Sequence, residues 1–282
     1  MLLDRSQPLF IQWRYLGSLA PYLLRFLVEA RADRFAKNIR VLASLVPGSY
    51  EAYKPLIDAA NIQPLVKPSG ELHVFESDAA FKDAQKNFDI RRANGVDVEV
   101  LDADGVQQLE PGLVRSIKHG VFLPGCYQTT NPFRFVDALA QHFVANGGSF
   151  INASVEDISM EPEGSAKITT DGGILSAEKV VLAFGAFSKP LAEKFGLRVN
   201  LDSERGYHVN LPNPGVVLNR AVISGDHQFA LAPIDDGVRV VGTTELAKVG
   251  APPNYPRAER LVPLAKHLLP GLADTGQTKW MG

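Results

Sequence analysis

The sequence predicts an α/β protein that carries an additional antiparallel region. Three observations support this class. Five consecutive apolar residues, Val180 to Phe184, are typical of a strand that is buried on both faces. Asp171-Gly172-Gly173, just before them, is a strong signal for a β-hairpin. The residues after Leu197 contain several strand candidates, so the last third of the chain is rich in β-structure.

Composition limits the classes of function. A chain of 282 residues with 45% hydrophobic and 21% charged residues is typical of a globular protein, with room for one large or two smaller domains. The net charge of -2 gives no reason to expect nucleic acid as a partner. Cys126 is the only cysteine, which excludes a disulfide framework and favours a reducing compartment, the cytoplasm. No apolar run has the length of a membrane span, and the first residues do not form a signal peptide.

Residues Pro8 to Ala60 have a helical apolar period that is interrupted at Pro47-Gly48. Aromatic residues between Trp13 and Phe26 fit a membrane-facing surface or helices packed on a globular body. The second interpretation is favoured, because the arginines nearby form no separate basic face.

The next segment alternates between short strands and helices. Glu71 to Glu76 is a strand candidate, and Ser77 is placed to cap a helix that runs through Ala93. Val96 to Leu101 and His119 to Leu123 are further strand candidates, with a helix start at Asp102 between them.

The clearest helix spans Asn131 to Gly148, with Asn131 as its N-cap and a proline at the first helical position. A strand candidate at 149–158 and the hairpin follow, and then the buried run Val180 to Phe184. Gly185 and Ala186 are small enough for a flat ligand to approach the backbone, and Ser188 is placed to cap a helix from Lys189 to Phe195. Ligands bind at the carboxyl ends of strands in open α/β sheets, but a packed strand-helix unit fits this stretch equally well.

The C-terminal strand candidates are 207–211, 216–223, 227–232 and 238–244, with a turn at 234–237, and a helix candidate follows at 257–269. No phosphate-binding glycine motif, metalloprotease motif or nucleophile elbow is present. The six histidines are scattered in sequence and indicate no metal site. Asp202, Glu204 and Arg205 fit a charged patch or a solvated turn with a surface ion pair. The residues alone therefore indicate an α/β protein that binds a small ligand.

Five segments in fixed order carry a resemblance to a known family. They are VVLAFGAFS, KFGL, ERGYHV, GVRVVGTTELA and the closing WMG. In this order they resemble the D-amino-acid oxidase-like flavoproteins, among them the bacterial D-amino-acid dehydrogenase type. The early segment PLFIQWRYLGSLAPYLLRFL and the strand GELHVFES are also similar to that family, so the resemblance covers essentially the whole chain. It implies an incomplete dinucleotide-type domain that binds FAD, interleaved with a substrate domain built on an antiparallel sheet. The corresponding segments are a helical part (1–67), substrate-domain parts (68–130 and 201–282) and an FAD-binding part (131–200).

The resemblance also implies site residues. Val155 would end the strand whose backbone meets the adenine, Ala183 to Ala186 (Gly185 at its centre) would form a turn near the flavin, and Gly242 would lie close to the cofactor. The substrate side would be formed by Tyr207, His208 and Thr243. The family reaction passes a hydride from the substrate Cα to flavin N5, and the imine hydrolyses to a 2-oxo acid and ammonia. The protein orients the substrate, largely by an arginine that holds its carboxylate.

Two family features are expected outside this sequence. The glycine-rich phosphate-binding turn would precede Met1, and the carboxylate-binding arginine would follow Gly282. The sequence is therefore interpreted as a fragment of a D-amino-acid oxidoreductase that is inactive by itself. The alternatives are a non-catalytic remnant that binds a small molecule or a partner, and an oxidase of glycine- or sarcosine-type amines. The electron acceptor, oxygen or quinone, stays open, and a quinone-linked enzyme would permit peripheral association with the inner membrane.

Overall fold

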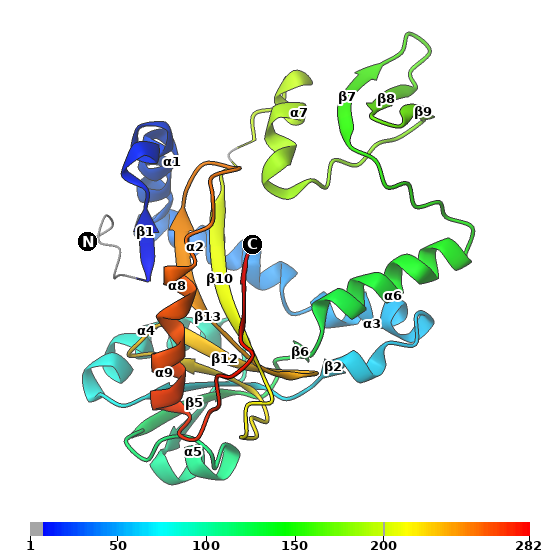
Figure 1. The fold of residues 1–282 in the computed structure, drawn as a ribbon. Coiled ribbons are helices and arrows are strands. Elements are labelled where there is room, and N and C mark those ends of the chain that lie inside the picture. Colours follow the sequence, from blue (N-terminus) through cyan, green and yellow to red (C-terminus); the bar gives the residue numbers. More distant parts are fainter. Residues whose placement is uncertain (1–7, 200) are drawn as a thin grey trace.

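A computed structural model describes residues 8–199 and 201–282 (Figure 1). The described residues form a mixed nine-stranded sheet with helices around it, which confirms the α/β class. The strand order is β14-β10-β13-β12-β11-β3-β5-β4, and β1 runs parallel to β13 beyond the end of β12. The strands are β1 (Leu9–Ile11), β3 (Glu71–Phe75), β4 (Glu99–Asp102), β5 (His119–Leu123), β10 (Glu204–Pro212), β11 (Ala221–Ser224), β12 (Phe229–Ile234), β13 (Gly237–Leu246) and β14 (Thr278–Met281).

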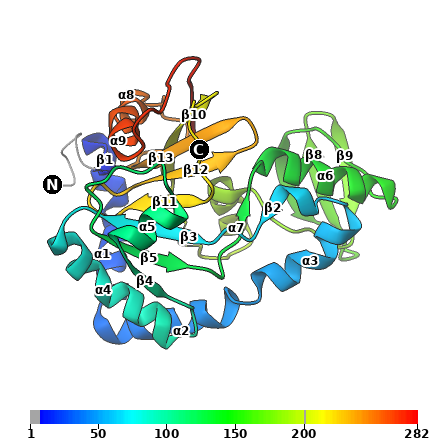
Figure 2. The same cartoon turned by 90° about the horizontal axis from the view of Figure 1, so that it is seen from below.

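The main core lies between one face of this sheet and the helices α8 (Pro256–Glu259) and α9 (Leu261–Leu268). Alternate residues of neighbouring strands, such as Val209, Val240 and Leu231, are register partners and point to the same face. They are buried in one cluster with Leu261 and Leu268 of α9. The view from below shows α8 and α9 stacked against the end of the sheet that contains β10 and β13 (Figure 2). The opposite faces of β10, β13 and β12 point away from these helices.

Two helices cover the other end of the sheet, and both begin where the sequence predicts. The Ser77 hydroxyl accepts a hydrogen bond from the Ala80 amide and caps α4 (Asp78–Ala93). The Asp102 carboxylate accepts from the Gly105 amide and caps α5 (Ala103–Leu109). These bonds satisfy backbone amides that have no partner within the helix.

The N-terminal segment confirms the predicted helices but begins with a short strand that the helical period did not predict. Its helices are α1 (Leu16–Glu29), α2 (Ala32–Leu45) and α3 (Ser49–Ala59). α1 packs through Leu19 on Ile11 and Leu246, whereas α2 has no buried residue. No helix of the described residues is long and apolar enough to cross a membrane. The 3-10 helix η1 (Trp13–Tyr15) lies between β1 and α1. The 3-10 helix η2 (Gln63–Leu65) and β2 (Val66–Lys67) connect α3 to β3, and β2 pairs with β6 (Gln128–Thr129), which follows β5.

Residues 131–199 extend away from the sheet as an arm (Figure 1). The arm contains α6 (Pro132–Ala145), the antiparallel strands β7 (Val155–Met160), β8 (Ala166–Thr170) and β9 (Gly173–Ala177), the 3-10 helix η3 (Gly185–Phe187) and α7 (Ser188–Lys194). Asn131 caps α6 and the hairpin joins β8 to β9, both as predicted. The strand predicted at 149–158 begins only at Val155.

The buried strand predicted for Val180 to Phe184 is wrong for this structure. These residues belong to no strand, and Val181 is 85% exposed. A strand buried on both faces requires parallel neighbours at its edges and helices above and below it. In the described part of the chain, β7, β8 and β9 pair only with one another and offer it no such neighbours. Ser188 also differs from the prediction, because its hydroxyl accepts from the Phe184 amide instead of capping α7.

A β-bulge in β13 explains one of the glycines. Tyr207 pairs with Thr243 and His208 pairs with Val241, so Gly242 is the extra residue. A Cβ added to Gly242 would lie 2.4 Å from the Cβ of Phe229 on the neighbouring strand. The glycine thus permits close approach of β12 to the bulge.

We expect Gly242→Ala to lower the free energy of unfolding by about 1–3 kcal/mol, because the added methyl group collides with the backbone and Cβ of Phe229. Gly206→Ala is the matched control, since a Cβ there meets nothing within 4 Å. Urea unfolding of both variants measures the difference. Equal stability of the two variants would contradict this explanation of the bulge.

Candidate functional site

The face of β14, β10, β13 and β12 that points away from α8 and α9 is called the open face here. Two rows of register partners cross it. The first row is Trp280, His208, Val241 and Ala230, and the second is Thr278, Asn210, Arg239 and Ala232. Cross-strand partners share a face of a sheet, and the residues between these rows lie in the core instead. The open face therefore carries an imidazole, an indole, an amide and a guanidinium side by side.

Arg239 is the cation of this face. Its Nε donates to the Asn210 Oδ1 at 3.0 Å, and no ion pair joins it to a carboxylate within residues 8–199 and 201–282. Burial lowers the pKa of the guanidinium, and the Asp236 carboxylate opposes this shift. An arginine nevertheless stays charged at neutral pH, so the terminal nitrogens are available to an anion.

His208 lies next to Arg239 as a neutral ring. The imidazole stacks on Trp280, with ring centroids 4.9 Å apart and planes 23° from parallel. Burial, with the positive charge of Arg239 as a second cause, lowers the pKa of His208 to about 4. The imidazole is therefore uncharged at neutral pH, and Arg239 is the charged side chain of the two rows.

The His208 shift predicts a pH dependence of stability. Its folded-state pKa of about 4 lies below the ordinary 6.5, so the unfolded chain binds the proton more tightly. The stability from the neutral ring is present above pH 6.5 and is lost as the pH falls from 6.5 toward 4. We expect the melting temperature of His208→Gln to fall less than that of the wild type over this range. If the melting temperatures of the two proteins fell equally over this pH range, His208 would not be the source of the pH dependence.

Tyr207 points into the core, opposite to its neighbour His208. Its hydroxyl donates to Glu245 Oε2 at 2.5 Å and accepts from the Asn254 amide at 3.0 Å. Arg205 forms a buried ion pair with Glu245, whose side chain is fully buried. Neither sequence interpretation of Arg205, a charged patch or a solvated turn with a surface ion pair, is right, because the alternation of β10 turns this residue inward, where Glu245 neutralises it.

Thr243 is also buried, on the core side of the bulge. Its hydroxyl donates to the Pro8 carbonyl at 3.2 Å and accepts from Arg257, which is itself buried. Of the three residues expected at the substrate, only His208 thus lies on the open face. The substrate roles of Tyr207 and Thr243 stay predictions.

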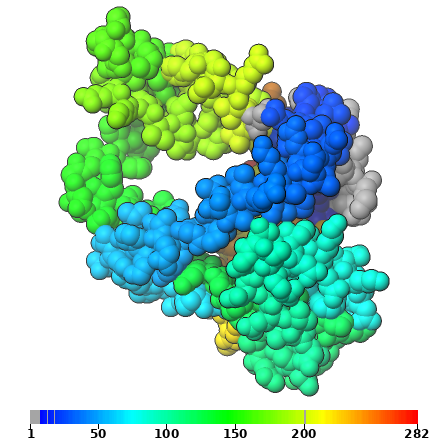
Figure 3. All heavy atoms as spheres, turned by 180° about the vertical axis from the view of Figure 1, so that it is seen from behind, coloured from blue at the N-terminus to red at the C-terminus, as the bar shows by residue number. Residues whose placement is uncertain are grey.

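The residues expected at the cofactor lie on two separate parts of the structure. Val155, Ala183, Gly185 and Ala186 belong to the arm, whereas Gly242 lies in the sheet. Figure 3 shows the surface open between the arm and the helices of the N-terminal segment. Apolar side chains are strongly exposed on the arm, among them Phe133 (78%) and Phe150 (75%). Their flavin contacts also stay predictions.

The composition of the open face fits a flat aromatic cofactor with an anionic substrate. Ala230, Ala232 and Gly206 are small, and a Cβ added to Gly206 would meet nothing within 4 Å. Trp280, at 55% exposure, offers an uncovered aromatic ring beside them. A planar ring system has room to lie against such a surface, and Arg239 supplies the charge that a carboxylate needs.

A cavity of about 560 Å³ lies elsewhere, between α4 and the ends of β3 and β11. It is lined by polar and aromatic side chains such as His73, Phe88 and Arg91 and contains none of the predicted site residues. Cys126 lies near the same end of the sheet, and burial raises the pKa of its thiol, as expected for an inert cysteine.

Sequence reasoning missed Arg239, Asn210 and Trp280. Arg239 stands in the pattern Gly237-Val-Arg-Val-Val, where its position between inward-facing valines indicates the opposite face. That alternation could have identified it. Trp280 could not be placed, because β14 is too short and polar to be recognised as a strand.

The fold of the described residues places the protein in the α/β class, with a mixed parallel and antiparallel sheet. The family described as FAD dependent oxidoreductase matches residues 9–282, and the chain belongs to that family. This confirms the resemblance to the D-amino-acid oxidase-like flavoproteins and FAD as the cofactor of the family.

Individual relatives agree with this membership. A D-amino-acid oxidase of Bradyrhizobium diazoefficiens is 31% identical over 264 residues, which are 92% of this chain and 62% of that protein. A D-amino acid dehydrogenase of Rhizobium rhizogenes is 24% identical over the whole chain and 69% of its own length. The structure of glycine oxidase from Bacillus cereus superimposes with a TM-score of 0.71 at 20% identity, covering 86% of this chain and 67% of that one. The chain thus spans less than two thirds of the length of the D-amino-acid oxidase.

Proposed function

We propose that this chain is part of an FAD-dependent oxidoreductase that oxidatively deaminates D-amino acids. The observation that carries the proposal is Arg239, a cation without a carboxylate partner among the described residues, on the uncovered face of the sheet. Support also comes from the relatives, which are a D-amino-acid oxidase and a D-amino acid dehydrogenase.

The open face would bind and orient the substrate. The guanidinium of Arg239 would hold the substrate carboxylate. Asn210 fixes Arg239 through the 3.0 Å bond to its Nε and leaves the terminal nitrogens free to form a bidentate contact. The sheet excludes water from one side of the substrate. When bound, FAD supplies the acceptor for the hydride that leaves the substrate Cα.

His208 would contribute by remaining uncharged. A protonated imidazole beside Arg239 would repel a substrate ammonium group, whereas the neutral ring tolerates an amine nearby. Hydride leaves the substrate Cα only when the substrate amine is neutral. A site in which Arg239 is the charged group at the substrate, and His208 is neutral, therefore suits the reaction. We assign His208 a positioning role, together with Trp280, on which it stacks.

The substrate side chain is the finer part of the proposal. Ala230 and Ala232 leave space on the open face, which favours an amino acid with a side chain over glycine. The structural similarity to glycine oxidase keeps a glycine-type amine as the second candidate.

Visible absorbance of the purified protein tests the proposal. The 282-residue chain is expected to hold little FAD and to be inactive, because it spans only 62% of the length of the related D-amino-acid oxidase. The protein expressed from its whole gene is expected to carry one FAD that bleaches with D-alanine. A whole-gene product that never binds flavin would refute the proposal. Stoichiometric flavin on the 282-residue chain that bleaches with D-alanine would refute the predicted inactivity.

A further inference from the structure

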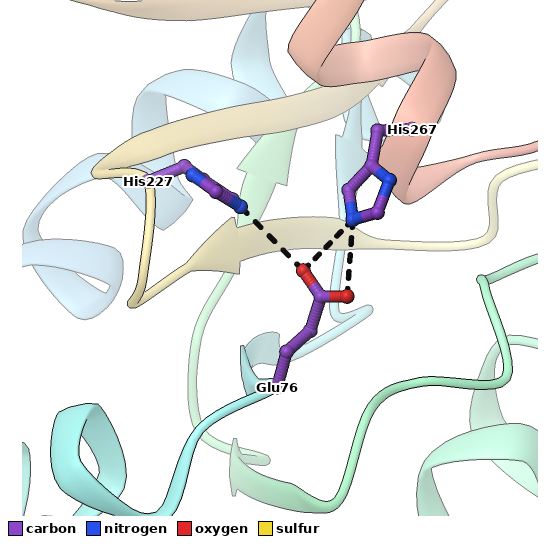
Figure 4. A group of neighbouring side chains, drawn as sticks. All are labelled: Glu76, His227 and His267. Carbon is purple, nitrogen blue, oxygen red and sulfur yellow. Dashed lines mark hydrogen bonds and ion pairs between the residues drawn. The ribbon is translucent and has the colours of Figure 1, made fainter.

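Three side chains from distant segments meet beyond the carboxyl ends of β3 and β11. They are Glu76, which follows β3, His227, in the turn between β11 and β12, and His267, in the last turn of α9. One ligand atom from each lies within 4.8 Å of the other two. Figure 4 shows both imidazole rings directed toward the Glu76 carboxylate. We propose that Glu76, His227 and His267 form a Zn²⁺ site.

The distances agree with a common metal ion. The His267 Nε2 lies 3.0 Å from each oxygen of Glu76, and the His227 Nε2 lies 3.5 Å from Oε2. Zinc binds imidazole nitrogen and carboxylate oxygen at about 2.0–2.2 Å, so two ligands of a tetrahedral ion are roughly 3.3–3.5 Å apart. The nitrogen–oxygen separations of 3.0 and 3.5 Å lie below this range and at its upper limit, and the ligand nitrogens of the two histidines are within 4.8 Å of each other. Side-chain rotations that bring the two imidazole nitrogens into this range would admit the ion.

The ligand set selects the metal. Two imidazole nitrogens and one carboxylate oxygen are a set that zinc sites use, with the fourth position open to water. Mg²⁺ and Ca²⁺ prefer oxygen ligands and gain little from two imidazoles. An ion can reach the site from solvent, because the side chains of His227 and His267 are 38% and 48% exposed. The Glu76 side chain is more buried, at 18% exposure.

The backbone around Glu76 is fixed before any metal binds. β3 and β11 are parallel neighbours, so their carboxyl ends bring Glu76 and the 225–228 turn together. The Asp226 carboxylate accepts from the amides of Glu76 at 2.8 Å and Ser77 at 3.2 Å. Ser116 donates to Glu76 Oε1. Such outer contacts orient metal ligands and strengthen binding.

The site is separate from the open face. His267 belongs to α9, which packs on the opposite side of the sheet from His208 and Arg239. A bound ion would therefore connect β3, the β11–β12 turn and α9, and would act on stability instead of on the proposed chemistry. The inference does not depend on the proposed function.

Zinc titration of the whole-gene product tests the site. The protein is purified without a histidine tag, stripped with a chelator and titrated with ZnCl₂ in a calorimeter. We expect about one ion per chain and a melting temperature that rises with zinc but not with equal MgCl₂ or CaCl₂. Glu76→Gln and His267→Ala should each weaken binding by at least ~10-fold. His267 is partly exposed on a helix, so its variant should fold even if the Glu76 variant does not.

His119→Ala is the matched control, because His119 contacts a single carboxylate, Asp78 Oδ1 at 2.8 Å, without a second histidine. Its zinc affinity should equal that of the wild type. Absence of stoichiometric zinc binding would overturn the proposal and leave an ordinary ion-paired cluster. Zinc binding that is unchanged in His267→Ala would overturn it as well.

Discussion

Arg239→Gln in the whole-gene product is expected to lower kcat/KM for a D-amino acid by roughly 10–100-fold, because a hydrogen bond to a charged group contributes about 1.5–3 kcal/mol. Most of the loss should appear in KM, since the carboxylate is held in both the ground state and the transition state. Steady-state kinetics with D-alanine measures the effect. Arg239→Lys should recover only part of it, because a lysine cannot form the bidentate contact.

Lys279→Gln is the control for charge. Lys279 lies on β14 next to Trp280 but points to the other face, where it contacts Glu259 of α8. The two substitutions each remove one positive charge, from strands that flank β10 on either side, and on opposite faces of the sheet. Nearly unchanged kinetics for Lys279→Gln would locate the substrate on the open face. Equal losses for the two variants would show that general electrostatics, and no specific contact, explains the Arg239 effect.

Glu245→Ala is expected to lower the free energy of unfolding by about 3–5 kcal/mol, the typical result of removing one partner from a buried ion pair. The substitution leaves Arg205 buried without its counter-charge and removes the acceptor of Tyr207. Burial disfavours the charged carboxylate, but hydrogen bonds from Tyr207 and Arg205 hold the pKa of Glu245 below its usual range. Urea unfolding followed by circular dichroism measures the change.

Asp274→Asn provides the comparison with an exposed pair. Asp274 contacts Lys266 at 3.1 Å with both side chains well exposed, so its loss should cost no more than about 1 kcal/mol.

The dependence of unfolding free energy on pH adds a second check of the Glu245 ion pair. The Glu245 pKa is depressed, so its contribution is present above the unfolded carboxyl pKa and is lost as the pH falls through the lower folded-state value. A Glu245→Ala variant as stable as Asp274→Asn would contradict the claim that the contacts of Glu245 with Arg205 and Tyr207 stabilise the fold.

Local signals in the sequence were sufficient for many elements. Ser77, Asp102 and Asn131 each cap a helix through a side-chain oxygen, and the hairpin at Asp171-Gly172 forms as its turn residues require. These features depend on neighbours a few residues apart, which is why a sequence reveals them.

Features that depend on distant partners were not predictable. The run Val180 to Phe184 is apolar, but in the described residues no parallel neighbour pairs with it. Arg205 was interpreted as part of a charged patch or of a solvated turn, because its buried partner Glu245 is 40 residues away in sequence. The Glu76, His227 and His267 cluster has no spacing motif, because its members are joined only by the parallel pairing of β3 with β11 and by the packing of α9.

The family resemblance supplied what the local patterns could not. It indicated FAD and the amino-acid chemistry before any geometry was known, and the match over residues 9–282 confirms the family. It did not identify Arg239, because the carboxylate contact of the family was expected after Gly282. The open face was recognised only when strand register placed His208, Asn210 and Arg239 side by side.

The most direct measurement is anaerobic reduction of the flavin in the whole-gene product by D-alanine, L-alanine and glycine. Loss of visible absorbance with D-alanine, together with slow or absent reduction by L-alanine and glycine, is the predicted result. Reduction by glycine alone, by both alanine enantiomers equally, or by none of the three would contradict a D-amino-acid oxidoreductase.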